Sequence, residues 1–194
     1  ASALEATAPS PAHAPTATPN QGLWQLLEMN PYIPEGASTA HAKAVIYAFF
    51  DPNCIFCHMG WKLSQPYLKT GLQVRWIPIA FVASDSAAKA AWLLTSKDPA
   101  AALNHGEGGW KEGVGDGGGA FLDAEVTPAV KAQIKANENL FRKLGLSATP
   151  SFVYLDKEGK LRTISGITNQ HMYSDMTGLA FIPTTDPALA EIPK

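Results

Sequence analysis

The sequence predicts an α/β fold in which helices flank a mixed β-sheet. First, an apolar run at Lys43–Phe50 is followed by a helical stretch and by a second apolar run at Leu72–Phe81, an order that pairs two strands in parallel. Second, short strands at Ser151–Asp156 and Lys160–Ser165 are joined by a Lys-Glu-Gly turn, which indicates an antiparallel hairpin. Third, a long helical region separates the two pairs, so a helical insertion is predicted at about residues 84–146.

Helix start and stop signals define the remaining elements. Before the first strand, Leu23–Met29 has apolar residues at helical spacing and ends at Asn30-Pro31. After that strand, a helix begins near Cys54 and runs to about Lys69. Capping residues open three helices within the insertion, and a last helix follows the hairpin. These four helices begin at Ser84 or Asp85, Asp98-Pro99, Thr127-Pro128 and about Asn169, and Gly145 ends the third.

Composition divides the chain into regions. Residues 1–22 are rich in Ala, Pro, Ser and Thr and are predicted to be a disordered tail. Residues 23–42 are predicted to form a linker helix and loop, residues 43–182 the main domain with its insertion, and residues 183–194 a flexible tail. Residues 106–119 hold eight glycines and little apolar content, which predicts a mobile surface loop.

The composition argues against several classes of function. Lys and Arg number 15 against 17 Asp and Glu, without blocks of like charge, so neither nucleic acid nor an anionic membrane is an expected partner. No apolar run approaches the roughly 20 residues that span a bilayer. No signal peptide begins the chain, so a mature form is expected. Hydrophobic residues make up 46% of the sequence, which is enough for a substantial core.

The chain has two cysteines, Cys54 and Cys57, separated by Ile55 and Phe56. A disulfide between them closes too small a ring to stabilise the fold much, so redox chemistry explains the pair better. Cys54 stands where a buried strand turns into a helix, and the free N–H groups and partial positive charge of a helix start stabilise a thiolate. Because the thiolate attacks disulfides, Cys54 is the predicted nucleophile. Cys57, one turn later and deeper, is the predicted resolving thiol.

A second signal is Thr149-Pro150, immediately before a predicted strand. A proline in this position is a candidate for a cis peptide bond. The order of elements matches the thioredoxin layout, in which this loop lies beside the Cys-x-x-Cys helix and its backbone pairs with an extended substrate segment. Thr149, Pro150, Ile55 and Phe56 are therefore the predicted substrate-binding residues. The Thr149 hydroxyl either hydrogen bonds near the sulfur atoms or satisfies its own backbone.

Residues Phe49–Cys57, with the sequence FFDPNCIFC, resemble the active-site segment of the bacterial disulfide isomerases DsbC and DsbG, and are nearer to DsbG. The resemblance covers roughly residues 23–178. Its other pieces are Trp24-Gln25 with Glu28, Ser96-Lys97-Asp98-Pro99, Asn137-Glu138, Leu144-Gly145 and Ala148-Thr149-Pro150. The resemblance implies a thioredoxin fold with a helical insertion, a cis peptide bond at Pro150 and a periplasmic location. It also implies protein substrates with disulfides or oxidised cysteines and a DsbD-type membrane reductase as partner.

Two departures from this family change what is expected. Its members carry an N-terminal dimerisation domain, whereas here a Pro- and Ala-rich tail precedes the linker helix. A monomer is therefore an alternative to the family's dimer. The dipeptide Ile55-Phe56 lacks the proline or glycine common in the family, so the family's reduction potential does not carry over. At the sixth position before Cys54, where several thioredoxin-like proteins bury a carboxylate, this chain has Ala48.

Other interpretations of the cysteine pair stay open at this point. A DsbA-like oxidase would donate its disulfide, and a chaperone would use the cysteines only as accessories. The segment Cys54–His58 also spells the c-type haem attachment signature, with Met172 or Met176 as the second axial ligand. A copper site using Cys54, Cys57 and His58 is a further alternative. No second Cys/His pair has zinc spacing, and the favoured interpretation needs no metal or other cofactor. In that interpretation His58 helps to hold the Cys54 thiolate if it is charged, or has no role in the chemistry.

Overall fold

A computed structural model describes residues 19–194, so most of the predicted N-terminal tail lies outside the described residues. Each predicted strand is present and ends within three residues of the expected position. The elements in chain order are α1 (Pro19–Met29), β1 (Ile33–Gly36), β2 (Ala44–Phe50), α2 (Ile55–Ser64), the 3-10 helix η1 (Gln65–Thr70), β3 (Leu72–Pro78), α3 (Ser86–Thr95), α4 (Pro99–Gly108), α5 (Pro128–Lys143), β4 (Ser151–Leu155), β5 (Leu161–Ser165), α6 (Met172–Thr177) and the 3-10 helix η2 (Pro187–Leu189).

The strands form one mixed sheet in the order β1-β3-β2-β4-β5. Strands β2 and β3 are parallel, with Ala48 opposite Trp76, and α2 makes the crossover between them. The pairs β1–β3, β2–β4 and β4–β5 are antiparallel. The predicted parallel pair and closing hairpin are thus both confirmed, and β2 lies at the centre of the sheet.

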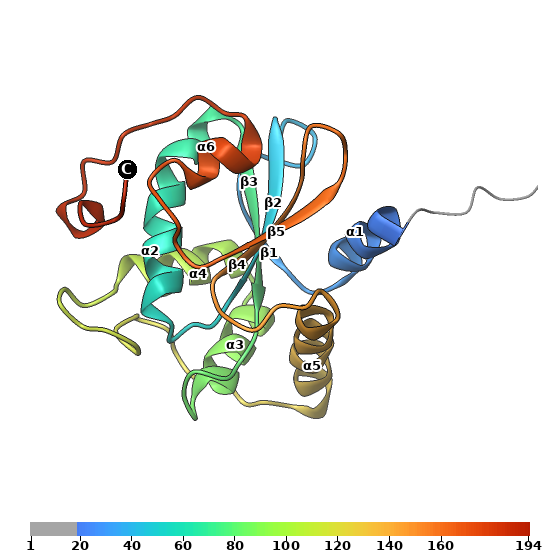
Figure 1. The fold of residues 1–194 in the computed structure, drawn as a ribbon. Helices are drawn as coiled ribbons and strands as arrows, with labels where there is room; N and C mark the ends of the chain where they lie inside the picture. The colour runs from blue at the N-terminus through green and yellow to red at the C-terminus, as the bar shows by residue number, and fades with distance from the viewer. Residues whose placement is uncertain (1–18) are drawn as a thin grey trace, which may run out of the picture.

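Helices cover both faces of the sheet, so strand β2 is apolar on both sides. Figure 1 shows α1 and α5 on one side of the sheet and α2, α4 and α6 on the other. Tyr47 and Phe49 point into the first layer, where they pack with Leu27 of α1 and Phe141 of α5. Alternate residues of the same strand, Ala48 among them, point into the larger core beneath α2.

The predicted insertion holds three helices, and α3 connects the two that lie on opposite sides of the sheet. Helix α3 contacts both α4 and α5, and α4 also packs against β1. Ala90 and Ala91 of α3 form a small core with Val130 and Ile134 of α5. Because α4 lies against the same side of the sheet as α2, the insertion brings its own side chains to the start of α2.

Two expectations about the N-terminal part are wrong. The tail predicted over residues 1–22 ends earlier, because α1 begins at Pro19, and proline is favoured in the first turn of a helix. The loop predicted after this helix contains strand β1, which pairs with β3. The sequence signal for β1 is weak because Pro34 lacks an N–H group. An edge strand tolerates such a residue.

The C-terminal tail predicted to be flexible over residues 183–194 is folded against the domain. Leu189 and Ile192 are buried. The carbonyl groups of Ile192 and Pro193 accept hydrogen bonds from the side chain and the backbone of Gln170. Asp186 forms an ion pair with Lys62 of α2. The tail therefore packs beside the active-site helix.

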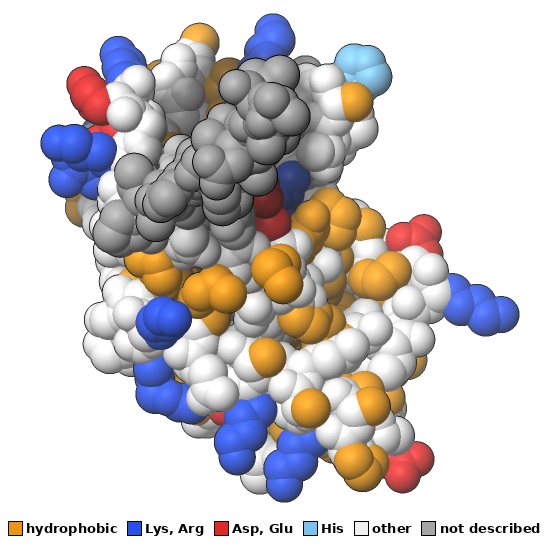
Figure 2. Space-filling view, turned by 90° about the vertical axis from the view of Figure 1, so that its right-hand side faces the viewer, with side chains coloured by type: hydrophobic (Ala, Val, Ile, Leu, Met, Phe, Trp, Pro, Cys, Tyr) orange, Lys and Arg blue, Asp and Glu red, His pale blue; other side chains and the backbone are white. Residues whose placement is uncertain are grey.

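Figure 2 shows the side of the molecule that carries α1 and α5, opposite the layer of α2. Hydrophobic side chains gather in the middle of this face, and Lys and Arg side chains lie mainly around its edges. Met29 at the end of α1 is 79% exposed. Within residues 19–194, none of the helices has the length and apolar character needed to cross a bilayer.

Candidate active site

The turn between β2 and α2 places Cys54 at the N-cap of the helix. The backbone of Cys54 is extended, and the chain becomes helical at Ile55. The Cys54 N–H donates to the carbonyl of Asp51 at 3.0 Å, which closes the turn. The predicted location of the cysteine at a strand-to-helix junction is confirmed. Its sulfur therefore lies at the positive end of the helix.

Asp51 fixes this turn from below with a fully buried carboxylate. One oxygen accepts the Asn53 N–H at 2.9 Å and the Ser86 hydroxyl at 2.8 Å. The other oxygen accepts the N–H groups of Phe81 and Val82 at 2.8 and 2.9 Å. The carboxylate thus ties the turn before α2 to the segment that follows β3. The sequence carries no signal for this role, because the partners at positions 81, 82 and 86 are distant along the chain.

Asn53 extends the same connection to α3. Its amide nitrogen donates to Asp85 and Ser86 at 2.8 and 2.9 Å. Its side-chain oxygen accepts from the Lys89 ammonium at 2.6 Å, and Lys89 also pairs with Asp85 at 3.1 Å. The residue before the nucleophile is therefore held by the first helix of the insertion.

The Cys54 sulfur lies among three groups that stabilise a negative charge. It accepts the Cys57 N–H at 3.2 Å, and the Thr149 hydroxyl donates to it at 3.5 Å. The third group is the Cys57 thiol, whose hydrogen bond makes the largest contribution to lowering the pKa of Cys54. Together the three groups lower this pKa to about 7, although burial acts in the opposite direction. The lowered pKa therefore favours the thiolate of Cys54 near neutral pH, compared with a free cysteine.

Cys57 lies behind Cys54 and is fully buried. Burial raises the pKa of the Cys57 thiol, and its hydrogen bond and proximity to Cys54 add to that effect. The two cysteines are free thiols in the structure. Their environments push the two pKa values apart, so one sulfur is poised as a nucleophile and the other stays protonated.

We predict that the alkylation rate of the reduced protein depends on pH through Cys54. Since a folded-state pKa of about 7 lies below that of a free cysteine, the rate should rise about tenfold per pH unit below pH 7 and level off above it. Mass spectrometry after limited iodoacetamide treatment should place the label on Cys54. A profile that still rises steeply at pH 8.5, or prior labelling of Cys57, would contradict the assignment.

The predicted substrate loop lies against the cysteine pair. The Thr149–Pro150 peptide bond is cis, the isomer that the sequence analysis expects. The Thr149 hydroxyl donates to the Cys54 sulfur at 3.5 Å, so of its two predicted uses the contact with sulfur is the one observed. The Thr149 carbonyl also lies 3.7 Å from this sulfur. Ile55 is half-buried, and Phe56 projects into solvent with 57% of its surface exposed.

The glycine-rich segment differs from the predicted mobile surface loop. Its first three residues, 106–108, belong to α4, and the loop after them packs over the turn before α2. The Gly117 N–H donates to the Asn53 carbonyl at 2.8 Å, and Asp116 accepts the Ile55 N–H at 2.9 Å. A Cβ atom on Gly118 would lie 2.4 Å from the Trp110 indole nitrogen. Glycine at position 118 therefore lets the backbone pack closely against the Trp110 ring.

His58 is held by the insertion. Its Nδ1 atom lies 2.8 Å from Oε2 of Glu107 in α4. The imidazole stacks on Trp110 at a ring distance of 4.5 Å and lies parallel to Trp61 at 6.0 Å. Burial lowers the pKa of His58 to about 4, and Lys62 adds to the effect. The lowered pKa favours the neutral imidazole, and the role of a charged His58 in holding the thiolate stays a prediction.

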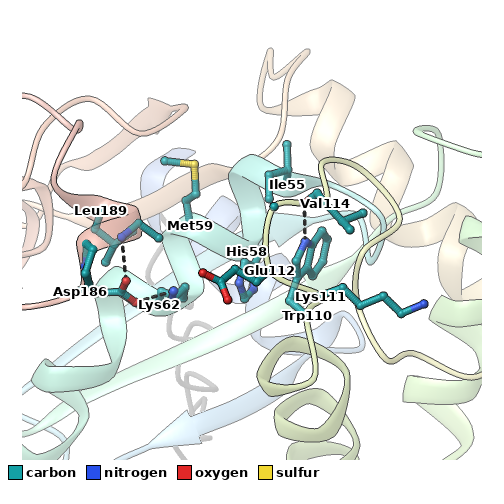
Figure 3. Close-up of a pocket in the computed structure, with 13 residues that line it drawn as sticks. Ile55, His58, Met59, Lys62, Trp110, Lys111, Glu112, Val114, Asp186 and Leu189 are labelled. Atoms are coloured by element: carbon teal, nitrogen blue, oxygen red, sulfur yellow. Dashed lines mark hydrogen bonds and ion pairs between the residues drawn. The ribbon is translucent and has the colours of Figure 1, made fainter.

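A groove of about 460 Å³ runs along α2 next to Cys54. Figure 3 shows Ile55, Trp110 and Val114 at one end and Met59, Leu189 and the Lys62–Asp186 ion pair at the other. The walls come from α2, the glycine-rich loop and the C-terminal tail. The glycine-rich loop and the C-terminal tail, both predicted to be flexible, therefore form two walls of this groove.

Sequence analysis missed Glu35 and Glu107, two carboxyl groups that are buried near the site. Glu107 follows Leu103 by four residues, so both lie on one face of α4. This spacing was the available signal, and the surrounding glycines obscured it. Glu35 lies in the strand that was predicted to be a loop, so it carried no signal.

The fold and the site define a thioredoxin-fold protein with a Cys-x-x-Cys pair at the start of its first crossover helix. The chain belongs to the thioredoxin-like family, because the family model for a thioredoxin-like domain matches residues 36–179. The predicted fold class is thereby confirmed.

The chain is similar to named disulfide interchange proteins. It is 34% identical to the thiol:disulfide interchange protein DsbG of Pseudomonas aeruginosa over 157 residues, which are 80% of this chain and 59% of that protein. It is 29% identical to DsbG of Escherichia coli K12, over 80% of this chain and 60% of that protein. The predicted resemblance to DsbG is confirmed, although the chain spans only about three fifths of these relatives' length.

Among solved structures, a thioredoxin-like oxidoreductase from Silicibacter pomeroyi DSS-3 superposes with a TM-score of 0.62 at 21% identity. The match covers 79% of this chain and 95% of that one. At this identity the match supports the fold alone.

Proposed function

We propose that the protein is a thiol–disulfide oxidoreductase that acts on other proteins. The observation that carries the proposal is the Cys54 sulfur at the N-cap of α2, which accepts hydrogen bonds from the Cys57 N–H and the Thr149 hydroxyl. The similarity to two thiol:disulfide interchange proteins supports disulfide exchange as the reaction, with a DsbA-like oxidase as the alternative.

The first step is attack by the Cys54 thiolate on a substrate disulfide. A mixed disulfide forms between Cys54 and one substrate sulfur, and the other substrate sulfur leaves as a thiolate. The carbonyl of Thr149 beside Cys54 and the exposed side chain of Phe56 offer an extended substrate polar and apolar contacts. Ile55 and Pro150 complete the proposed substrate-contacting set.

The second step is resolution by Cys57. Once Cys54 is bonded to the substrate, its negative charge is gone, and the effect of that charge on the Cys57 pKa disappears with it. The Cys57 sulfur then attacks the Cys54 sulfur, the Cys57 proton passes to the departing substrate sulfur, and the substrate thiol leaves as the Cys54–Cys57 disulfide forms. Isomerisation results when the substrate's own thiol attacks first instead.

The same attack extends to cysteines oxidised to sulfenic acid. Cys54 displaces hydroxide from the oxidised sulfur and forms the same mixed disulfide, which Cys57 resolves. Reduction of a disulfide or of a sulfenic acid leaves the pair oxidised, so a reductant must restore it, whereas isomerisation returns the pair in its reduced form. The resemblance supports a DsbD-type membrane reductase in this role and a periplasmic location, with a monomer and a dimer as alternative assemblies.

We predict that Cys57→Ala traps the first intermediate. Mixed with a protein that carries scrambled disulfides, this variant should accumulate a covalent adduct that a non-reducing gel resolves and dithiothreitol removes. Peptide mapping should place the bond at Cys54, the one cysteine of this sequence that the variant retains.

The matched control is the double variant Cys54→Ala/Cys57→Ala, which should form no adduct. An unmodified Cys57→Ala protein would refute the proposed mechanism. The haem and copper alternatives gain no support from the geometry, because His58 is bonded to Glu107 and stacked between two indoles. Within residues 19–194, His, Cys, Asp and Glu side chains do not group in threes as a metal site would require.

A further inference from the structure

The proposed mechanism leaves a buried acid cluster unused. Between α2, α4 and β1 lie two carboxyl groups, Glu107 and Glu35, which are 1% and 6% exposed. Glu35 accepts hydrogen bonds from three neutral donors, the indoles of Trp61 and Trp76 and the amide of Gln65. Neither carboxyl group forms an ion pair with a Lys or Arg side chain in the described part of the chain.

Glu107 has a different environment from Glu35. Its hydrogen bond goes to Nδ1 of His58 at 2.8 Å, and the N–H of His58 donates to the Cys54 carbonyl at 3.1 Å. His58 thus connects the Glu107 carboxyl group to the first turn of α2, at whose N-cap Cys54 lies. A buried carboxylate without a cation is costly, so a proton on this pair is favoured.

We propose that Glu107, hydrogen bonded to His58 beside the first turn of α2, binds a proton when the Cys54–Cys57 disulfide is reduced and releases it when the disulfide forms again. This inference rests on the proposed redox function of the pair. Glu107 does not contact the reacting sulfur atoms, so it acts as a proton-binding residue that supports the thiolate rather than as a catalytic one.

Electrostatics gives the direction of the coupling. Burial is the main cause that raises the pKa of Glu107, and the Cys54 thiolate and Glu35 raise it further. The disulfide carries no such charge, so oxidation removes the thiolate contribution and the carboxyl group becomes more acidic. The charged and titratable groups that face Glu107 are His58 and Cys54 from α2 and Glu35 from β1. Lys62 and Asp186 act on it only through His58.

The electrons and protons balance when a dithiol reduces the protein. The dithiol supplies two electrons, which break the Cys54–Cys57 bond, and two protons. One proton goes to the Cys57 sulfur, while Cys54 remains a thiolate above pH 7. The second proton goes to the Glu107 carboxylate instead of to solvent, and the dithiol leaves as a disulfide.

The direct test is the Glu107 carboxyl titration, followed by ¹³C NMR in the whole protein in both redox states. We expect its midpoint to lie at higher pH in the dithiothreitol-reduced protein than in the oxidised protein. An unchanged midpoint would overturn the inference. This measurement uses the unmodified chain, so it does not depend on whether a variant folds.

A second readout is the pH dependence of the equilibrium with dithiothreitol. Between the two Glu107 midpoints, the equilibrium constant of the unmodified protein should change more steeply with pH than that of Glu107→Gln. The difference should reach up to about tenfold per pH unit, equal to about 30 mV for two electrons. Glu125→Gln, an exposed site in the same insertion, should retain the steep dependence. Equal slopes in Glu107→Gln and the unmodified protein, or a slope lost only in Glu35→Gln, would overturn the assignment.

These measurements separate the two proposals. Reduction by dithiothreitol does not require a client protein, so a shifted Glu107 midpoint without exchange activity would refute only the proposed function. Exchange activity with an unshifted midpoint would refute only the proton-binding role.

Discussion

Replacement of Cys54 by alanine is expected to reduce disulfide exchange to the level of the buffer alone. The sulfur that carries the thiolate is removed, and Cys57 cannot substitute for it because it is fully buried with a raised pKa. The measurement is the recovery of a native protein from a scrambled-disulfide substrate, with the unmodified protein as reference. Exchange that persists above a few per cent of the reference, on the order of measurement error, would refute Cys54 as nucleophile.

Cys54→Ser is the matched control for folding. The Cys54 sulfur caps α2 by accepting the Cys57 N–H, and a serine hydroxyl can accept the same hydrogen bond, whereas alanine loses about 1 kcal/mol of capping free energy. We therefore expect the serine variant to be as inactive as the alanine variant but more stable. If the serine variant still suppressed aggregation of an unfolded client, that activity would belong to a chaperone function independent of the thiols.

Replacement of Asp51 by alanine is expected to produce a large loss of stability. The buried carboxylate accepts hydrogen bonds from Asn53, Phe81, Val82 and Ser86, and alanine would leave these buried and part-buried donors without their acceptor. We expect the free energy of unfolding to fall by about 3–4 kcal/mol, which lowers the melting temperature by roughly 10 °C for a chain of this size. Thermal and urea unfolding followed by circular dichroism would measure it.

Two control variants test whether the loss of stability comes from the hydrogen bonds that Asp51 accepts. Asp51→Asn keeps one acceptor oxygen and should lose less stability than alanine. Asp123→Ala, at an exposed position of the insertion, should change the free energy of unfolding by less than about 0.5 kcal/mol. A stability of Asp51→Ala equal to that of the unmodified protein would show that the network contributes little.

The Asp51 network and the Glu107–His58 pair have a common consequence. Both connect the first turn of α2 to the helical insertion, one through α3 and one through α4. The insertion is therefore more than an addition to the thioredoxin-like sheet. It supplies buried polar contacts to the segment that carries Cys54.

The sequence by itself determined the features that depend on local patterns. The apolar run that became β2, the Cys54–Cys57 spacing at a strand-to-helix junction and the Thr149-Pro150 step each predicted the correct element, because each signal lies within a few residues. Together they were sufficient for the fold class and for the location of the two cysteines at the start of α2.

Only the tertiary structure decided which polar groups are buried together. Glu107 lies 49 positions from His58 in the sequence, and Asp51 lies 35 positions from Ser86. Composition suggested flexibility for the glycine-rich loop and the C-terminal tail, yet both pack beside α2. Burial depends on which segments meet in the folded chain, and it sets the pKa of a carboxyl group or an imidazole. Local sequence therefore located the reactive sulfur atoms, while long-range packing determined the electrostatic environment around them.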